Sequence, residues 1–426
     1  MFHGEPRLPN VRSDLLKCHG SEVTKTMNNT SPRTLYVTSC WPNGNGYGGQ
    51  LRAFHIGRAL QQLGRPTLVV IGADEVEAKV KAKAAEEYDL GREIRIVPCP
   101  SRSQISRAAS IFDPAFVNIH GVVAEARDEA WMAEFQKQFD LTWFCKLRTA
   151  NYFSKANWRR SVVDVDDLPS TMERSLLQTA QDMRTRLKSR LRIFELSQHE
   201  SRLHRRFNVL GVCSEHDREI LGGRSSIHVI PNGFKRPLSL PLRKPSHPPR
   251  IGFMGLYSYS PNSEGVRWFI RHCWDRVKAE VPGVRLRLVG EDSNGPLKPN
   301  DPSVDGLGWV ENPEEEVASW SHMIVPIRFG AGTRVKIADA FSRKCPVVST
   351  RFGALGYEVE DGRELLLADN PADFTAACIR LLKDTEAASA IAERAYGRFL
   401  EKWTWEAISP KVLEAAEDCL RLNSSR

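Results

Sequence analysis

The sequence predicts an α/β protein made of two successive domains, each built around an open parallel β-sheet. Apolar runs with strand character alternate with runs of helical periodicity, an order that indicates parallel strands joined by crossover helices. The alternation stops at residues 234–250, FKRPLSLPLRKPSHPPR, where five prolines and five cations in seventeen residues predict a linker. It restarts at Ile251, so a ligand cleft is expected between the carboxyl edges of the two sheets.

The first domain is expected to follow a polar leader without periodicity, residues 1–32. A Gly-rich loop and an amphipathic helix occupy residues 40–64, and a further helix is expected over residues 130–139. Strand character marks residues 33–39, 65–74, 140–148, 161–167, 207–214 and 226–233.

The second domain repeats the alternation. Strands are expected at residues 251–255, 284–290 and 321–327, and helices at residues 264–283 and 313–320. The next segment combines a Gly-rich loop, a short helix and a buried strand, which is the order of a βαβ unit.

That Gly-rich loop, residues 330–333, has the features of an anion site. Thr333 can cap the helix, whose free N-terminal amides and dipole attract negative charge. Arg334 and Lys336 add positive charge there. Asp339 either belongs to this site or is only the ion-pair partner of Lys336 at i, i+3 spacing.

The composition is that of a globular chain of 426 residues, long enough for two or three domains. No apolar run approaches the roughly 20 residues of a membrane-spanning helix, and the first residues lack the apolar core of a signal peptide. Nine scattered cysteines without metal-ligand spacing predict free thiols in a reducing compartment, and hence a cytoplasmic protein. The net charge of +8 indicates an acidic partner: phosphates, nucleic acid or an anionic membrane.

Much of the positive charge lies in residues 170–208, where nine Arg or Lys face four Asp or Glu. Apolar residues recur there at roughly helical spacing: Leu187, Leu191, Phe194, Leu203 and Phe207. This pattern favours a long amphipathic helix with a solvated basic face over a membrane-binding surface, and the second interpretation stays open.

Several motifs occur in one order and spacing: GYGGQLR, IPNG, GFMGLYSYSPNSEGVRWF, VRLRLVG and GAGTRVKIADAFSRKCPVVSTRFGALGYEVEDGRELLLADNPADF. Together they resemble the family 4 (group 1) glycosyltransferases of the GT-B architecture, and the sequence looks most similar to bacterial sugar transferases that build exopolysaccharide or lipid-linked glycans. The resemblance implies two Rossmann-like domains facing a cleft, residues 33–234 and 251–402. It also implies a linker at residues 235–250 and a C-terminal helix, residues 403–426, that crosses back to the first domain.

The resemblance further implies a retaining transfer from a nucleotide-sugar donor to a glycan or lipid-linked acceptor, without a cofactor and without a metal ion. Protein cations and amides would stabilise the departing diphosphate. The residues implied at the donor are Gly48, Gly49, Gly255, Gly290, Trp309, Val310, Gly330, Ala331, Gly332, Thr333, Arg334, Lys336 and Asp339. Of these, Arg334, Lys336 and Asp339 would be catalytic, with Asp339 accepting hydrogen bonds from the donor ribose.

Two positions depart from the family pattern. Ala331 stands where the family has the first acid of a paired motif, and residues 255–265 lack the cations that bind the diphosphate in many members. Arg334 and Lys336 could substitute for those cations. The alternatives are a non-catalytic nucleotide- or glycan-binding protein and a nucleotide-sugar epimerase. No nucleic acid is expected as a partner, because no RNA- or DNA-binding motif is present, whereas peripheral contact with the inner face of an anionic membrane stays open.

For the acceptor, the sequence offers His120, Arg148 and Tyr152. Some relatives place a histidine near the acceptor, and the other two residues follow a strand, at the edge where ligands bind in open sheets. Structural roles stay open for all three.

Arg52 could face the same cleft or form a salt bridge on a helix surface. We expect Asp164, Asp166 and Asp167 to form a loop and a helix cap. Contact with the acceptor is the alternative. Gly233 is expected to shape the hinge between the domains.

Overall fold

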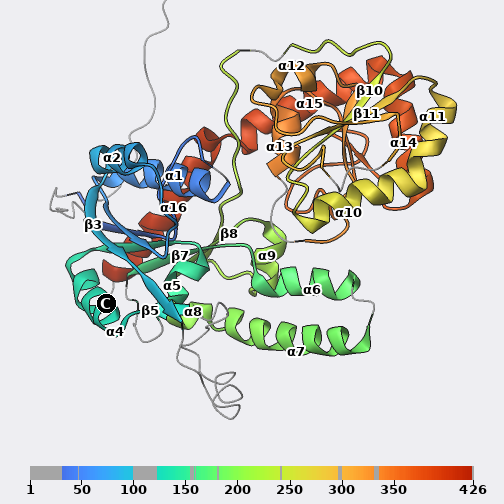
Figure 1. Ribbon diagram of the computed structural model, residues 1–426. Coiled ribbons are helices and arrows are strands. Elements are labelled where there is room, and N and C mark those ends of the chain that lie inside the picture. Colours follow the sequence, from blue (N-terminus) through green and yellow to red (C-terminus); the bar gives the residue numbers. More distant parts are fainter. Residues whose placement is uncertain are drawn as a thin grey trace, which may run out of the picture. The chain divides into compact units, whose positions relative to one another are not determined.

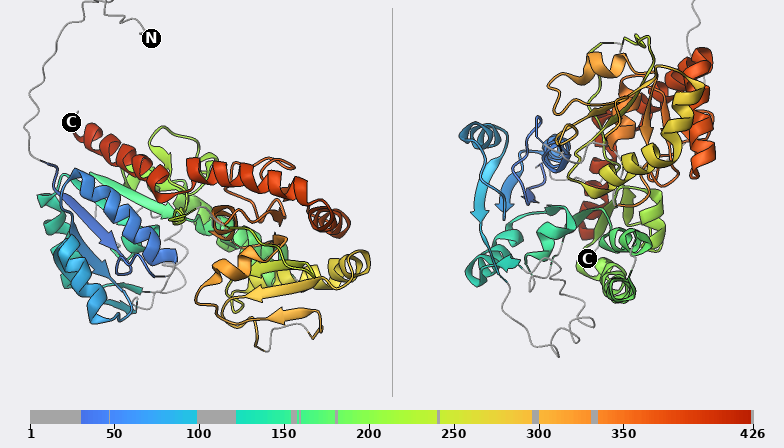
Figure 2. Two further views of the ribbon diagram at one scale, coloured as in Figure 1. Left: turned by 90° about the horizontal axis from the view of Figure 1, so that it is seen from above. Right: turned by 45° about the vertical axis from the view of Figure 1, so that its right-hand side comes forward.

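The computed structural model describes residues 31–46, 48–98, 122–153, 158, 160–179, 182–239, 242–295, 300–330 and 335–424. Figures 1 and 2 show its strands and the helices that flank them. The predicted leader, apart from its last two positions, lies outside the described residues.

The N-terminal sheet has seven strands in the order β3-β2-β1-β6-β7-β8-β9, and every neighbouring pair is parallel. Its strands are β1 (Thr34–Thr38), β2 (Thr67–Ile71), β3 (Asp89–Ile94), β6 (Leu141–Cys145), β7 (Ser161–Asp166), β8 (Val209–Val212) and β9 (Ile227–Val229). A separate antiparallel pair joins β4 (Ile96–Pro98) to β5 (Val122–Ala124). The strand order reverses between β1 and β6, and open α/β sheets bind ligands beyond the carboxyl ends of strands at such a point.

The C-terminal sheet has six parallel strands in the order β12-β11-β10-β13-β14-β15. They are β10 (Arg250–Met254), β11 (Arg285–Val289), β12 (Val304–Gly306), β13 (His322–Val325), β14 (Val347–Ser349) and β15 (Leu366–Leu367). Here the order reverses between β10 and β13. Both sheets are therefore doubly wound and Rossmann-like, as the alternation of strands and helices predicts.

Helices connect the strands in both parts. Before the linker they are α1 (Gly48–Leu60), α2 (Ala78–Glu87), α4 (Ala126–Phe135), α5 (Leu147–Asn151), α6 (Pro169–Thr179), α7 (Met183–Glu200), α8 (Leu203–Arg206) and α9 (Glu215–Ile220), with 3₁₀ turns η1 (Gln61–Leu63) and η2 (Gln136–Gln138). After the linker they are α10 (Ser260–Phe269), α11 (Asp275–Glu280), α12 (Pro313–Ala318), α13 (Val335–Ser342), α14 (Pro371–Lys383), α15 (Thr385–Lys402) and α16 (Trp405–Ser424). A π-helical turn, η3 (Ile270–Trp274), joins α10 to α11, so the predicted helix at residues 264–283 is one helical run with a π-bulge.

The N-terminal sheet is buried on both faces. Tyr36 belongs to one apolar cluster, while its strand neighbours Leu35 and Val37 belong to another. Successive side chains of a strand point to opposite faces, so the two clusters lie on opposite sides of the sheet. This explains why the strands read as continuous apolar runs rather than as alternating patterns.

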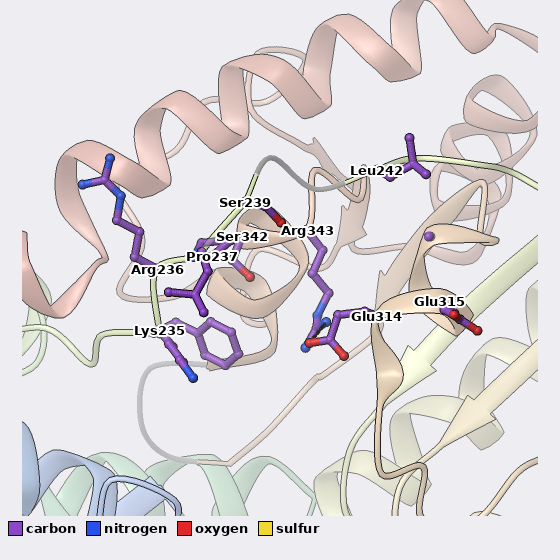
Figure 3. Close-up of a pocket in the computed structure, with 12 residues that line it drawn as sticks. Lys235, Arg236, Pro237, Ser239, Leu242, Glu314, Glu315, Ser342 and Arg343 are labelled. Atoms are coloured by element: carbon purple, nitrogen blue, oxygen red, sulfur yellow. Dashed lines mark ion pairs between the residues drawn. The ribbon is translucent and has the colours of Figure 1, made fainter.

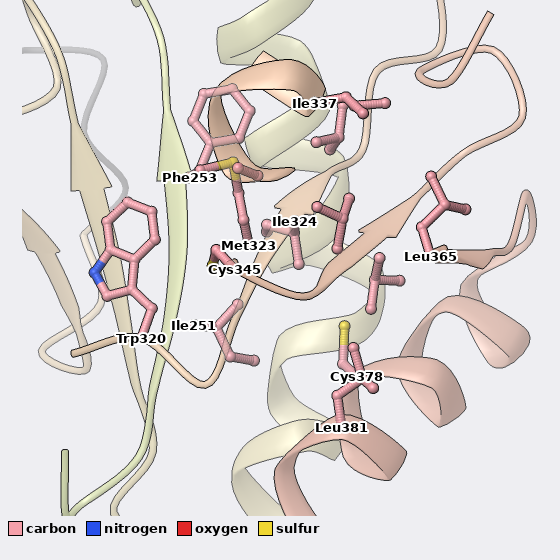
Figure 4. Packing of buried hydrophobic residues seen from close by; sticks show 14 of the residues in the cluster. Ile251, Phe253, Trp320, Met323, Ile324, Ile337, Cys345, Leu365, Cys378 and Leu381 are labelled. Atoms are coloured by element: carbon pink, nitrogen blue, oxygen red, sulfur yellow. The ribbon is translucent and has the colours of Figure 1, made fainter. Parts of the chain in front are cut away.

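The core of the C-terminal sheet is a single large cluster, part of which is drawn in Figure 4. The indole of Trp320 packs against the backbone of β10 so closely that a Cβ on Gly252 would lie 1.9 Å from the ring. Glycine is therefore required at this strand position. The seven cysteines among the described residues are all free and buried, as predicted for a chain that uses thiols as small apolar side chains.

The last helix, α16, packs on the N-terminal sheet. Trp405, Ile408 and Val412 join the cluster that contains Tyr36, and the Phe234 amide donates to the Trp403 carbonyl over 2.8 Å. A Cβ on Gly233 would lie 2.7 Å from the Trp405 ring, so this glycine is needed where the chain passes the helix. The prediction that the C-terminal helix crosses back is confirmed.

The linker makes more hydrogen bonds to the C-terminal domain than its proline-rich composition predicts. The Lys244 and Ser246 amides donate to the carbonyls of Ala318 and Ser319, each over 2.9 Å. The Arg243 guanidinium donates to the carbonyls of Val317 and Trp320. The second half of residues 235–250 is thus bound to the C-terminal domain.

The predicted helix with a solvated basic face is present as α7, but it is shorter than its apolar pattern indicates and packs differently. The helix ends at Glu200, and Leu203 and Phe207 lie in the core beyond it. Leu187, Leu191 and Phe194 are exposed, because α7 packs through a different face. None of the described helices combines the length and apolar character that crossing a bilayer requires.

Candidate functional site

The loops after β10 and β11 meet through glycines at the carboxyl edge of the C-terminal sheet. Gly290 has a φ of 126°, and a Cβ there would lie 2.2 Å from the Gly255 carbonyl oxygen. The Gly255 amide donates to the Val289 carbonyl over 2.9 Å, which holds the two loops together. The structure thus brings together two glycines that the family resemblance implies at the donor, and no side chain fits at Gly290.

Lys336 brings a cation to the same loops. It lies in the first turn of α13, and its Nζ donates to Oδ1 of Asn262 over 3.0 Å. Asn262 lies in the first turn of α10, and its Nδ2 donates to the Leu256 carbonyl over 2.8 Å. The ammonium thus lies at the N-terminus of a helix that follows β10, where residues 255–265 supply no cation of their own.

Sequence reasoning missed Asn262. Its signal was a short polar side chain near the start of a predicted helix, a position that indicates capping rather than ligand binding. In the structure the side-chain amide links the Lys336 ammonium to the loop after β10.

The remaining residues of the predicted anion loop are described only in part. Ala331, Gly332, Thr333 and Arg334 lie outside the described residues, and so does His120. Gly330 has a φ of 125°, which favours glycine. Its amide donates to the Ser175 hydroxyl.

Asp339 is buried on α13 and forms its ion pair with Arg343, four residues further on, over 2.7 Å. The alternative interpretation of Asp339 as the partner of Lys336 is therefore wrong, since the Lys336 ammonium lies at Asn262. Arg343 also contacts Glu314 over 3.0 Å. Burial raises the pKa of Asp339, and the guanidinium of Arg343 opposes that rise.

Trp309 and Val310 follow β12. Val310 packs against the C-terminal core, whereas Trp309 is 78% exposed. Gly308 has a φ of 68°, and its amide donates to the Ser293 hydroxyl over 2.9 Å. The turn fixed in this way leaves a large apolar ring in solvent, which is unusual for tryptophan.

On the N-terminal sheet, Gly48 and Gly49 open α1. A Cβ on Gly48 would have no atom of the described residues within 4 Å, so packing does not demand glycine here. Open space at a helix start is what the approach of a phosphate would require.

Arg52 is fully buried, which contradicts both the cleft-facing and the surface interpretation. Its Nε and Nη2 donate to the two carboxylate oxygens of Asp164 over 2.8 and 2.6 Å. The remaining donors reach the carbonyls of Ile230 and Pro231 and Oδ1 of Asn232. Arg52 therefore ties α1 to β7 and to the segment after β9.

Asp164 and Asp166 belong to β7 rather than to a loop and cap, whereas Asp167 lies in the short loop before α6, as predicted. Asp166 has a φ of 64° and lies 3.1 Å from Nζ of Lys146, whose φ is 75°. Burial would raise the pKa of Asp166, but Arg52 and Lys146 hold it well below its usual range. Burial, together with Asp166, raises the pKa of Asp167 to about 7.

Asp166, Asp167 and Cys213 have ligand atoms within 4.8 Å of one another, a grouping that could hold a metal ion. Two features oppose a cation there. Lys146 and Arg52 already place positive charge on Asp166, and burial raises the pKa of the Cys213 thiol, so the thiolate that binds metals is disfavoured.

Of the predicted acceptor residues, Arg148 is exposed on α5 and its guanidinium donates to the Tyr152 hydroxyl. Tyr152 is buried in the N-terminal core, in agreement with the structural alternative. Arg148 and Asp167 follow adjacent strands, β6 and β7, at the carboxyl edge of the sheet.

A cavity of about 540 Å³ lies elsewhere on the C-terminal domain, between the linker, α12 and α13 (Figure 3). Its walls include Lys235, Leu242, Glu314 and Arg343, with Arg343 reaching toward Glu314. It contains none of the predicted donor residues, so it is distinct from the glycine-lined loops after β10 and β11.

A match to a family model falls in the same half of the chain. Residues 248–384, which contain these loops and Lys336, match the family model of glycosyl transferases group 1. An uncharacterized 44.6 kDa protein from the cps region of Klebsiella pneumoniae is 23% identical over 215 residues. That match covers 46% of this chain and 55%, about half, of the relative.

Two solved structures are similar over nearly the whole chain. Anabaena Alr3699/HepE, in complex with UDP and glucose, has a TM-score of 0.53 at 16% identity, covering 90% of this chain and 98% of its own. Sucrose-phosphate synthase from Thermosynechococcus elongatus has a TM-score of 0.61 at 14% identity, covering 92% and 100%. At sequence identities this low, the similarity to these two structures extends to the fold alone. Residues 248–384 are therefore similar to a glycosyl transferases group 1 domain, within a chain that has the GT-B fold of two Rossmann-like domains.

Proposed function

We propose that the protein is a retaining glycosyltransferase that moves a sugar from a nucleotide-sugar donor to a glycan or lipid-linked acceptor without a metal ion. The observation that carries the proposal is the Lys336 ammonium at Asn262, in the first turn of α10. Its neighbours are the glycine loops after β10 and β11. The group 1 family match and the structural similarity to a protein solved with UDP support it.

The donor diphosphate would bind at this edge of the sheet. Its negative charge favours the N-terminus of α10 and the ammonium of Lys336, while Gly255 and Gly290 let the backbone come close. The Gly330 amide is already bound to the Ser175 hydroxyl, so Arg334 and the amides of residues 331–333 would complete the site that the sequence predicts. When the bond between sugar and phosphate breaks, the charge that develops on the departing diphosphate would be stabilised by groups already in place.

The nucleoside would extend away from these loops. The carboxylate of Asp339, whose Oδ1 accepts from Arg343, would accept hydrogen bonds from the ribose through Oδ2. The exposed indole of Trp309, together with Val310, would offer the base a face for stacking.

On the N-terminal sheet, Gly48 and Gly49 would admit the donor phosphates. The acceptor would bind at the carboxyl ends of β6 and β7, close to Arg148 and Asp167. The carboxyl of Asp167, whose pKa is about 7, could accept a hydrogen bond or a proton from a sugar hydroxyl. His120 keeps its predicted place among the acceptor residues.

The test is release of nucleoside diphosphate from UDP-, GDP- and ADP-sugars in the presence of a chelator. Each donor is first screened by thermal shift, because a ligand at 100 times its dissociation constant adds about 2.7 kcal/mol of stability. One donor should be hydrolysed, and Lys336→Gln should abolish most of that activity. Lys383→Gln, a surface lysine of α14 paired with Glu280, is the matched control.

Each alternative gives a different result in this assay. A donor that binds and is never turned over, with any glycan acceptor, would identify a non-catalytic nucleotide-binding protein. Interconversion of two nucleotide-sugars would identify an epimerase. A requirement for a divalent cation would contradict the metal-independent mechanism.

A further inference from the structure

Helix α7 carries a continuous stripe of exposed apolar side chains. Met183 is 74% exposed, Leu187 60%, Leu191 64% and Phe194 55%. These residues recur every third or fourth position, so they share one face of the helix. The stripe is about 16 Å long at 1.5 Å per residue.

The opposite face of α7 holds the helix to the protein. Ser189, Ile193 and Leu196 are buried, and α6 packs alongside (Figure 1). At 100° per residue these three positions lie roughly opposite the stripe. The Asp182 side chain caps the helix by accepting from the Thr185 amide over 2.8 Å. The stripe is therefore exposed on a helix whose orientation is fixed by other contacts.

Cations flank the stripe on both sides. Arg184, Arg186, Lys188 and Arg190 are exposed, and none of them forms an ion pair with a residue that the structure describes. The segment from Met183 to Phe194 contains no acidic residue at all. Around the helix axis, Arg186 and Arg190 fall on one side of the apolar positions and Arg184 and Lys188 on the other.

We propose that α7 docks on the surface of an anionic lipid bilayer, with its apolar stripe in the headgroup region and its cations against the lipid phosphates. An amphipathic helix with apolar residues between rows of Arg and Lys has the properties of a helix that lies in the membrane interface. The short stripe and the polar buried face are incompatible with spanning the bilayer. Membrane contact thus follows from charge and exposure alone, independently of any enzymatic activity.

Two other partners fit the surface less well. A second copy of the chain, docked stripe to stripe, would bring eight like charges together and would be opposed electrostatically. A nucleic acid would use the cations but would leave the apolar stripe in water, because such binding depends on cations and stacking aromatics rather than on aliphatic side chains.

The experiment is sedimentation of the full chain with vesicles of phosphatidylcholine, with and without phosphatidylglycerol. The protein should bind the anionic vesicles, bind the neutral ones weakly, and lose affinity with added salt. The triple variant Leu187→Ser, Leu191→Ser, Phe194→Ser should bind at least tenfold more weakly. Neutralising the four cations with Gln should cost about fivefold for each one. The matched control is Leu238→Ser with Leu242→Ser, two exposed leucines of the linker.

Circular dichroism of each variant establishes that the fold is intact before binding is compared. Vesicle binding that survives both the stripe and the charge variants would overturn the proposal. So would a wild-type dimer that becomes monomeric in the stripe variant while neither protein binds vesicles, which would identify an interface between copies. If the wild-type protein binds anionic vesicles but turns over none of the donors, the enzymatic proposal is refuted and the membrane proposal stands.

Discussion

Replacing Arg52 by leucine should destabilise the N-terminal domain by about 3–5 kcal/mol, the cost of breaking a buried ion pair by removing one partner. Both carboxylate oxygens of Asp164 accept hydrogen bonds from Arg52, and neither side chain is exposed. Leucine would leave the carboxylate and the carbonyls of Ile230 and Pro231 without these donors. Burial already raises the pKa of Asp164 and Arg52 opposes that rise, so the Asp164 carboxyl should take up a proton in the variant.

Urea unfolding followed by far-ultraviolet circular dichroism measures the loss in the free energy of unfolding. The matched control is Arg285→Leu, which removes a guanidinium paired with Asp305 at a partly exposed site; such pairs contribute about 0.2–1 kcal/mol. Arg52→Leu combined with Asp164→Leu should recover part of the stability, because no buried carboxyl is left without its hydrogen-bond donors. A loss for Arg52→Leu no larger than that for Arg285→Leu would refute the reasoning.

Three further predictions concern single residues. Since an aspartate titrates near 3.9 in the unfolded chain and Asp167 near 7 in the fold, the folded state holds more protons between those values and stability falls as pH rises from about 4 to 7. Asp167→Asn should therefore be more stable than wild type at pH 8 and little different near pH 4 in urea unfolding; an equal difference at both would contradict the raised pKa, which burial, Asp166 and Asp217 produce against the opposing charges of Lys146 and Arg52. Asp339→Asn should weaken nucleotide binding by about 1–2 kcal/mol, mainly as a higher KM, whereas unchanged affinity by calorimetry would leave Asp339 with only its Arg343 pair. Gly290→Ala, with its Cβ 2.2 Å from a carbonyl oxygen at a φ of 126°, should lower the melting temperature and cost at least about 1–3 kcal/mol; a variant as stable as wild type would show that these loops rearrange freely.

The sheets could be predicted because parallel strands buried on both faces leave long apolar runs in the sequence, as at Leu35 to Val37. The segment from residues 75 to 124 was not predicted, because β3 is largely exposed and α2 buries little beyond Ala84. Without a clear periodicity, neither element has a signal that distinguishes it from a loop.

The site could be predicted where glycines mark close approach, as at Gly255 and Gly290, and not where distant side chains meet. Arg52 and Asp164 are 112 positions apart, and Lys336 and Asn262 are 74 apart. Nothing local in the sequence distinguishes such partners from ordinary surface charges. The same limit applies to the exposed apolar stripe of α7. Which apolar side chains of α7 face solvent depends on where α6 packs, and the sequence of α7 alone does not show this.

Binding of UDP, GDP and ADP measured by calorimetry tests the donor site most directly, because it needs neither the acceptor nor the sugar. At least one nucleoside diphosphate should bind wild type and Lys383→Gln equally well. The same ligand should bind Lys336→Gln about 10- to 150-fold more weakly, which corresponds to the loss of one charge-assisted contact of roughly 1.5–3 kcal/mol. If none of the three nucleotides binds wild type, or if Lys336→Gln binds as tightly as wild type, the diphosphate does not lie between α10 and Lys336, and the proposed donor site is wrong.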